Sequence, residues 1–216
     1  MSHSAVEYWW VFVRGAGVTV GLSALALVLG LIVGTLIALM RLSRFWILRA
    51  LGLAYVEFFR SIPILVLLFF SFFGLSYFLG VDLSPFLAAT ISLTLLASSA
   101  LAEVVRAAIL SVGSGQWQAA RAAGMFPFQI YRYVIVPQAV RVMMGPTVSV
   151  YIGTLKDSSY AAVIGYVELM KSGLFVRDVT RDGLTSLLIV SLLYFVINYA
   201  ISLVGHRVEM KFKVIT

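Results

Sequence analysis

Long apolar segments separated by shorter polar segments run through most of the chain. Each apolar segment holds about 18 or more largely apolar residues, the length that an α-helix needs to cross a hydrocarbon core of about 30 Å. The pattern predicts membrane-spanning helices at about residues 17–40, 51–79, 86–105, 139–160 and 183–204. The sequence therefore predicts an all-α polytopic membrane protein with five spans, in which residues 1–216 form a single transmembrane domain.

One polar segment, residues 113–137, is longer than the other connections. Its turn formers predict two short helices with a sharp corner between them: Ser114 as the N-cap of the first, Gly124 in the left-handed conformation at its end, and Pro127 in the first turn of the second. Pro137 marks the entry to the fourth span. On these residues alone, an amphipathic helix lying on lipid headgroups is an equally good interpretation.

The excess of positive charge is unevenly placed along the chain. There are 16 Lys and Arg residues against 9 Asp and Glu, for a formal net charge of +7. With five spans, one side of the membrane receives Arg41, Arg44, Arg49, Arg106, Arg121, Arg132, Arg141, Arg207, Lys211 and Lys213, and the other receives Arg14, Lys171, Arg177 and Arg181. The positive-inside rule then places the N-terminus outside, the C-terminus in the cytoplasm, and the loop 106–137 on the cytoplasmic side. We interpret the charge as a sign of topology and expect no nucleic-acid partner.

The composition excludes several kinds of site. The chain is 62% hydrophobic and has no cysteine, so disulfides, zinc–thiolate sites and thiol nucleophiles are ruled out. Its two histidines, His3 and His206, lie near the termini. We therefore expect no metal site.

Ionisable residues inside the predicted spans each need a reason, because a charge within the bilayer costs at least about 2.5–3.5 kcal/mol. Glu57 and Arg60 are three residues apart on one helical face and can form an ion pair, either as a structural element or as part of a gate. Pro63 should kink the helix beside them. Glu103 and Arg106 have the same spacing near the inner end of the third span, and we expect this pair to anchor the following loop.

A second polar group lies near the end of the fourth span. Lys156 and Asp157 are adjacent, so on an unbroken helix they point about 100° apart. Either the helix breaks there or each charge has its own partner. With Ser158 and Ser159 this segment could face a cavity that receives a molecule carrying both an ammonium and a carboxylate group. The alternative is a helix end with Lys156 extending to the interface. Ser98 is a candidate polar residue of the same pathway on the third span.

Several motifs resemble those of a known family. Gln118-Ala119-Ala120, then Gly124, then Val134 to Pro137 resemble the "EAA" loop of bacterial ABC importer permeases, with Gln118 in place of the usual Glu. Four further segments resemble the polar amino acid permeases: Tyr55 to Pro63, Glu103 to Arg106, Leu155 to Ser159, and Val163 to Leu169.

The resemblance implies the type I ABC importer permease fold, a bacterial inner-membrane location, and transport of a polar amino acid. It implies that Gln118, Ala119, Ala120, Arg121, Gly124 and Met125 couple this chain to a cytoplasmic ATPase dimer. For the polar residues within the spans, Glu57, Arg60, Ser98, Lys156, Asp157, Ser158 and Ser159, we expect a place along the substrate path or at its gate. The other expected partners are a second permease subunit, an extracytoplasmic amino-acid-binding protein and membrane lipid. The sequence has no phosphate-binding loop, so ATP and Mg²⁺ belong to the ATPase, and we expect no enzyme activity and no bound cofactor in this chain.

Two other functions are compatible with a polytopic membrane protein. A secondary transporter or channel for a small polar solute would work without ATP, but this interpretation gives residues 113–137 no function. An intramembrane enzyme has no Ser/His or paired-Asp arrangement to support it. ATP dependence of uptake separates the first interpretation from these two.

Overall fold

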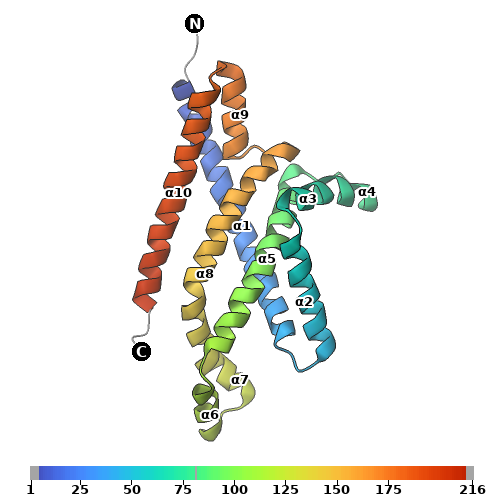
Figure 1. Ribbon diagram of the computed structural model, residues 1–216, viewed down its shortest axis with the longest axis vertical. Coiled ribbons are helices and arrows are strands. Elements are labelled where there is room, and N and C mark those ends of the chain that lie inside the picture. The colour runs from blue at the N-terminus through green and yellow to red at the C-terminus, as the bar shows by residue number, and fades with distance from the viewer. Residues whose placement is uncertain (1–4, 81, 213–216) are drawn as a thin grey trace.

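The computed structural model describes residues 5–80 and 82–212, and every regular element in this part of the chain is helical (Figure 1). His3 and Lys213 lie outside the described residues. The elements are η1 (Ala5–Tyr8), α1 (Trp9–Arg41), α2 (Trp46–Ser61), α3 (Ile64–Phe69), η2 (Phe70–Gly74), α4 (Leu75–Leu79), α5 (Pro85–Ser111), α6 (Ser114–Ala122), α7 (Pro127–Ile130), η3 (Tyr131–Ile135), α8 (Val136–Asp157), η4 (Ser158–Ile164), α9 (Leu169–Thr180) and α10 (Gly183–Phe212). Of the η segments, η1 and η4 are 3₁₀ helices, and η2 and η3 are π-helical turns.

The long helices α1 and α5 pack along each other and form the centre of the molecule. Small residues on α1 allow this approach: a Cβ at Gly34 would lie 2.8 Å from the carbonyl oxygen of Ser98, and a Cβ at Gly30 would lie 3.0 Å from the Cβ of Ala97. Small residues spaced four apart are a common device for close helix packing in membranes. Any side chain at Gly34 would push the two helices apart.

The second predicted span is broken. Trp46–Ser61 and Ile64–Phe78 meet at an angle of 102°, so that α3 and α4 project sideways from the bundle (Figure 1). The break lies where Pro63 predicts a kink, and it is much sharper than a kink. Pro63 has no N–H to continue α2, and it holds Ile62 in an extended conformation with φ −90° and ψ 129°.

Three of the described helices are long and apolar enough to cross a membrane: Ala5–Arg41, Pro85–Ser111 and Gly183–Lys211. The bent pair α2 and α3–α4 makes a fourth if it is counted as one span. Helix α8 is not among them, because Arg141, Lys156 and Asp157 and several Ser, Thr, Gly and Pro residues lower its hydropathy. The count of five spans therefore stays a prediction.

The helix of the fourth predicted span begins earlier than expected. Helix α7, the π-turn η3 and α8 follow one another without a loop, so the helix starts at Pro127 and runs to Asp157. Pro137 is the second residue after the π-turn, and its missing N–H leaves the carbonyl of Tyr133 without its usual α-helical donor. The start of α1 and helix α9 lie at one end of the molecule, and α6, α7 and the end of α10 lie at the other (Figure 1).

Candidate functional site

The segment Gly113–Pro137, which we call the knuckle, forms a tight corner between α6 and α7. The corner is a Schellman motif: the N–H of Gly124 donates to the carbonyl of Arg121 at 3.0 Å, and the N–H of Met125 donates to that of Ala120 at 3.1 Å. Gly124 has φ +76°, in the left-handed region that the sequence predicts. A β-branched residue is strained in this conformation, so the corner depends on glycine.

The two helices of the knuckle are capped differently from each other. Gly113 is the N-cap of α6, and its carbonyl accepts from Gln116 at 3.0 Å. The prediction of Ser114 as the cap is therefore wrong, because Gly113 already holds the extended conformation and Ser114 is the first helical residue. Pro127 starts α7 as predicted, and the side chain of Gln129 accepts from the N–H of Phe126 at 2.9 Å.

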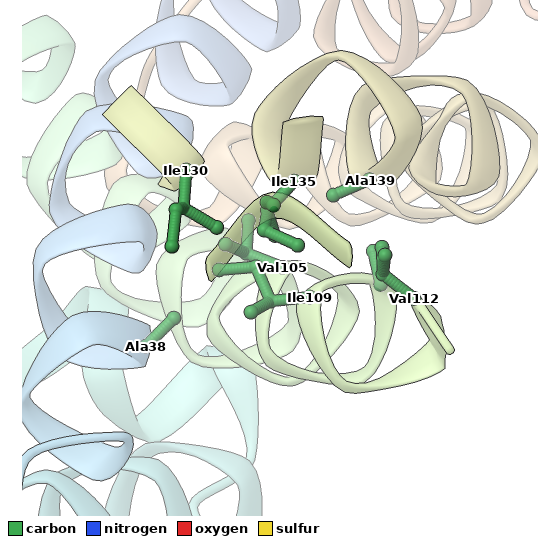
Figure 2. Close-up of a cluster of buried hydrophobic side chains, with 9 residues drawn as sticks. Ala38, Val105, Ile109, Val112, Ile130, Ile135 and Ala139 are labelled. Atoms are coloured by element: carbon green, nitrogen blue, oxygen red, sulfur yellow. The ribbon is translucent and has the colours of Figure 1, made fainter. Parts of the chain in front are cut away.

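A buried apolar cluster fixes the knuckle to the rest of the protein (Figure 2). Ile130 and Ile135, from α7 and η3, are 2% and 0% exposed. They pack against the C-terminal ends of α1 and α5, which the predicted topology places on the cytoplasmic side. The other buried members are Ala38, Val105, Ala108, Ile109, Val112, Ala120 and Ala139. Trp117 adds an edge-to-face contact with Tyr131, with ring centroids 5.0 Å apart. The knuckle is therefore packed firmly against the helix bundle through a shared buried core.

The opposite face of the knuckle is open. Of the predicted coupling residues, Gln118, Ala119, Arg121, Gly124 and Met125 are exposed. Ala120 is buried and belongs to the apolar cluster, so it supports this face from behind. The exposed residues surround the glycine corner and leave it accessible to a partner.

A group of charges lies where α1, α2 and α5 meet. Glu103 forms ion pairs with Arg41 and with Arg106, the latter at 2.9 Å, so that one carboxylate joins the end of α1 to α5. The sequence predicts the pair with Arg106 but gives no signal for Arg41. Glu57 and Arg60 of α2 lie within electrostatic range of Arg41 and are both exposed. In the described part of the chain, these two residues form no ion pair with each other, so the predicted pair is not formed; both side chains lie on the exposed surface of α2.

Ser98 is placed differently from a residue that lines a path. Its side chain is fully buried in α5, and its hydroxyl lies 2.7 Å from that of Tyr55 on α2. It also donates to the carbonyl of Leu95 at 2.8 Å. In this structure Ser98 holds α2 against α5.

The polar group at the end of α8 lies at a change of helix type. The α-helix ends at Asp157, and a 3₁₀ helix runs from Ser158 to Ile164. Lys156 is exposed and Asp157 is half-buried, whereas Ser158 is fully buried and donates to the carbonyl of Leu155. Ser159 is half-buried and donates to the carbonyl of Lys156 at 2.7 Å.

The sequence gives little sign of a buried carboxylate that joins three elements. Glu168 is 0% exposed and caps α9 by accepting from the N–H groups of Met170 and Lys171 at 2.9 and 2.8 Å. Thr19 of α1 and Tyr194 of α10 donate to the same carboxylate at 3.3 and 2.9 Å. Four donors therefore compensate for its burial. The polar interval between the last two predicted spans in fact contains the end of η4 and all of α9. The available sequence signal for the cap was an acidic residue directly before an apolar run.

Among the described residues, no group of three or more His, Asp or Glu side chains gathers as a metal site would require.

Comparisons with known proteins point to one family. The sequence profile described as "Binding-protein-dependent transport system inner membrane component" matches residues 26–214. A probable amino-acid ABC transporter permease protein of Bacillus subtilis, YckA, is 33% identical over 208 residues, which cover 96% of this chain and 92% of that protein. The glutamine transport system permease protein GlnP of Escherichia coli is 31% identical over 209 residues, covering 95% and 94%.

Solved structures give the same result. A chain from a crystal structure of an amino acid ABC transporter with histidines superposes with a TM-score of 0.89 at 31% identity, over 98% of this chain and all of that chain. A chain of the MetNI methionine ABC transporter in an inward-facing conformation superposes with a TM-score of 0.82 at 25% identity, over 96% and 99%.

Proposed function

Because the chain belongs to the family of binding-protein-dependent transport system inner membrane components, we propose that it is the permease subunit of an ATP-driven importer for a polar amino acid. The relatives of similar length are amino-acid or glutamine permeases by name, and the alignment with them covers nearly the whole chain. The chain forms the translocation path, and ATP hydrolysis with its Mg²⁺ takes place on a separate ATPase subunit.

The observation that carries the proposal is the knuckle. It is anchored through Ile130 and Ile135 to the bundle, while Gln118, Arg121, Gly124 and Met125 face away from it. A surface of this kind, held rigidly and left open, fits a cleft on an ATPase dimer. Because the helix from Pro127 continues to Asp157, a push on the knuckle is passed directly to the polar group at the far end of α8.

The substrate path follows the exposed stripe of α8. Pro146, Ser149 and Lys156 are exposed and lie on one face at helical spacing, and Asp157 flanks them. Lys156 attracts the carboxylate of the amino acid and Asp157 its ammonium group. Ser159 lies beside them, and the buried Ser158 and Ser98 act as supports behind the path.

The remaining charged residues, Glu57 and Arg60, lie unpaired with each other on α2, next to the sharp break at Pro63, a position that suits a gate. The stripe on α8 is open on one side in a single chain, so we assign a second permease subunit, identical or homologous, to close the path. Five crossings place the knuckle in the cytoplasm and α9 outside, where an amino-acid-binding protein would dock.

Uptake by a reconstituted complex tests this function. The permease is co-expressed with its ATPase, purified, and inserted into liposomes with the binding protein outside and ATP inside. We expect uptake of a radiolabelled polar amino acid that requires ATP and stops when a non-hydrolysable analogue replaces it. Uptake that is driven by an ion gradient and is indifferent to ATP would support a secondary transporter instead.

A further inference from the structure

An apolar groove runs between α8 and α10. Its volume is about 640 Å³, and Leu31 of α1 closes one side. Its wall consists mostly of aliphatic and methionine side chains from the two helices, including Val140 and Met143 of α8 and Ala200 and Val208 of α10. The helices touch beside the groove where Val148 packs against Gly205: a Cβ at Gly205 would lie 2.6 Å from Val148 Cγ1.

The polar groups in the groove are too few for a polar solute. Thr147 has a buried hydroxyl without a hydrogen-bond partner, and Tyr151 directs its hydroxyl to the carbonyl of Val20 at 3.5 Å. An amino acid bound here would leave most of its charged groups unpaired, at a large cost. The groove also lies on the side of α8 away from Pro146, Ser149 and Lys156, because its lining residues are roughly half a helical turn from that stripe.

The length of the groove matches one leaflet of a bilayer. From Val140 to Tyr151 the helix rises by about 16 Å at 1.5 Å per residue. Half of a hydrocarbon core of about 30 Å is about 15 Å. The groove therefore has the length of one acyl chain that extends from a membrane surface towards the midplane.

The end of the groove at the membrane surface is basic. Arg141 follows the lining residue Val140, and Arg207 and Lys211 flank the lining residue Val208; all three basic side chains are exposed. The acid in this part of the described chain is Glu209, whose carboxylate lies against the backbone of Gly145 on α8. His206 is exposed on the same turn of α10. Three basic residues against one acid favour an anionic headgroup.

We propose that the groove between α8 and α10 binds one anionic phospholipid, with an acyl chain against the apolar wall and the phosphate headgroup at Arg141, Arg207 and Lys211. The site goes beyond the transport function, since it lies outside the proposed substrate path. Its role is to fill the cleft beside the Val148–Gly205 contact and so hold α10, which is otherwise largely exposed, against α8.

Native mass spectrometry of the purified full-length permease tests the site. The protein is delipidated in detergent and titrated with phosphatidylglycerol or with phosphatidylcholine of the same acyl chains. We expect one tight phosphatidylglycerol per chain and weaker binding of phosphatidylcholine. Ala200→Phe, which fills the groove, should abolish the tight site. Ser202→Phe adds the same ring on the other face of α10 and should leave it intact.

Two double variants, each of which removes two positive charges, test the headgroup contacts without changing the shape of the groove. Arg207→Gln with Lys211→Gln should weaken phosphatidylglycerol binding roughly thirtyfold, at about 1 kcal/mol per basic residue, and leave phosphatidylcholine unchanged. Arg44→Gln with Arg49→Gln removes the same charge elsewhere and should have little effect on the tight site.

Three results would overturn the proposal: equal affinity for the two lipids, an unchanged tight site in Ala200→Phe, or a tight site lost equally in Arg44→Gln with Arg49→Gln. Dissociation of a permease dimer in Ala200→Phe without any loss of lipid would assign the groove to a second copy of the chain. Thermal midpoints measured on each variant identify any that fail to fold, and the charge variants then decide, since their changes lie on the exposed surface.

Discussion

The phenol of Tyr194 donates a 2.9 Å hydrogen bond to the buried carboxylate of Glu168, and this contact ties α10 to the start of α9. The carboxylate also accepts a hydrogen bond from Thr19 of α1, which lies 149 residues away in the sequence, so α1, α9 and α10 meet at one buried side chain. A buried carboxylate of this kind is stable only while its donors remain.

Tyr194→Phe should therefore destabilise the protein by about 1.5–3 kcal/mol, the usual contribution of a hydrogen bond to a charged group. Tyr199→Phe is a matched control, because Tyr199 is exposed on the same helix and stacks on Phe195. The thermal unfolding of each purified variant in detergent measures the difference. Equal unfolding midpoints for the two variants would mean that Glu168 is not held by Tyr194.

Gly124→Val should disturb the knuckle, because valine is strained at φ +76°. We expect a loss of ATPase binding with little change in membrane insertion, measured by pull-down of the ATPase on the tagged permease. Gly115→Val is the control: Gly115 lies in the same knuckle, has no positive φ and has open space around it. Retention of the ATPase by Gly124→Val at the level of the control would argue against the knuckle as the coupling surface.

Asp157→Asn keeps the size of the side chain and removes its charge. If Asp157 lines the path, uptake should fall at least tenfold while the thermal midpoint and the association with the ATPase stay the same. Asp82→Asn, in the exposed turn before α5, is the control for loss of an acid. Uptake and stability are measured on the same purified complex. A lower midpoint together with lower uptake would show that Asp157 is structural.

The five-span topology predicts which surfaces an impermeant thiol reagent can reach. A cysteine at Gln116, in the exposed knuckle, should be protected in intact cells, and one at Asp178 on α9 should react. Ser172, although in the same external interval, is unsuitable because it is 1% exposed. The native chain has no cysteine, so the background is clean. The reverse labelling pattern would overturn the orientation.

Local chemistry made much of the knuckle predictable. Gly124 and Pro127 have few conformations open to them, so the corner and the helix start follow from the residues themselves. The break at Pro63 was predictable for the same reason, although its angle was not, since the angle depends on how α3 packs against α5.

Contacts between distant segments could not be predicted in the same way. Nothing near Arg41 in the sequence indicates Glu103 as its partner, and nothing near Ser98 indicates Tyr55. Ser98 and Ser158 are polar residues on predicted spans, but whether a hydroxyl faces a path or a neighbouring helix depends on how the helices pack. Only the assembled bundle decides this.

The helix from Pro127 to Asp157 acts as a lever. At 1.5 Å per residue it is about 45 Å long, so a tilt of about 5° around its middle moves each end by about 2 Å in opposite directions. A shift of about 2 Å is enough to break a hydrogen bond or open a contact. The knuckle and Asp157 are therefore opposite ends of one continuous helix, and the π-turn at Tyr131–Ile135 and Pro146 are the places between them where that helix can bend.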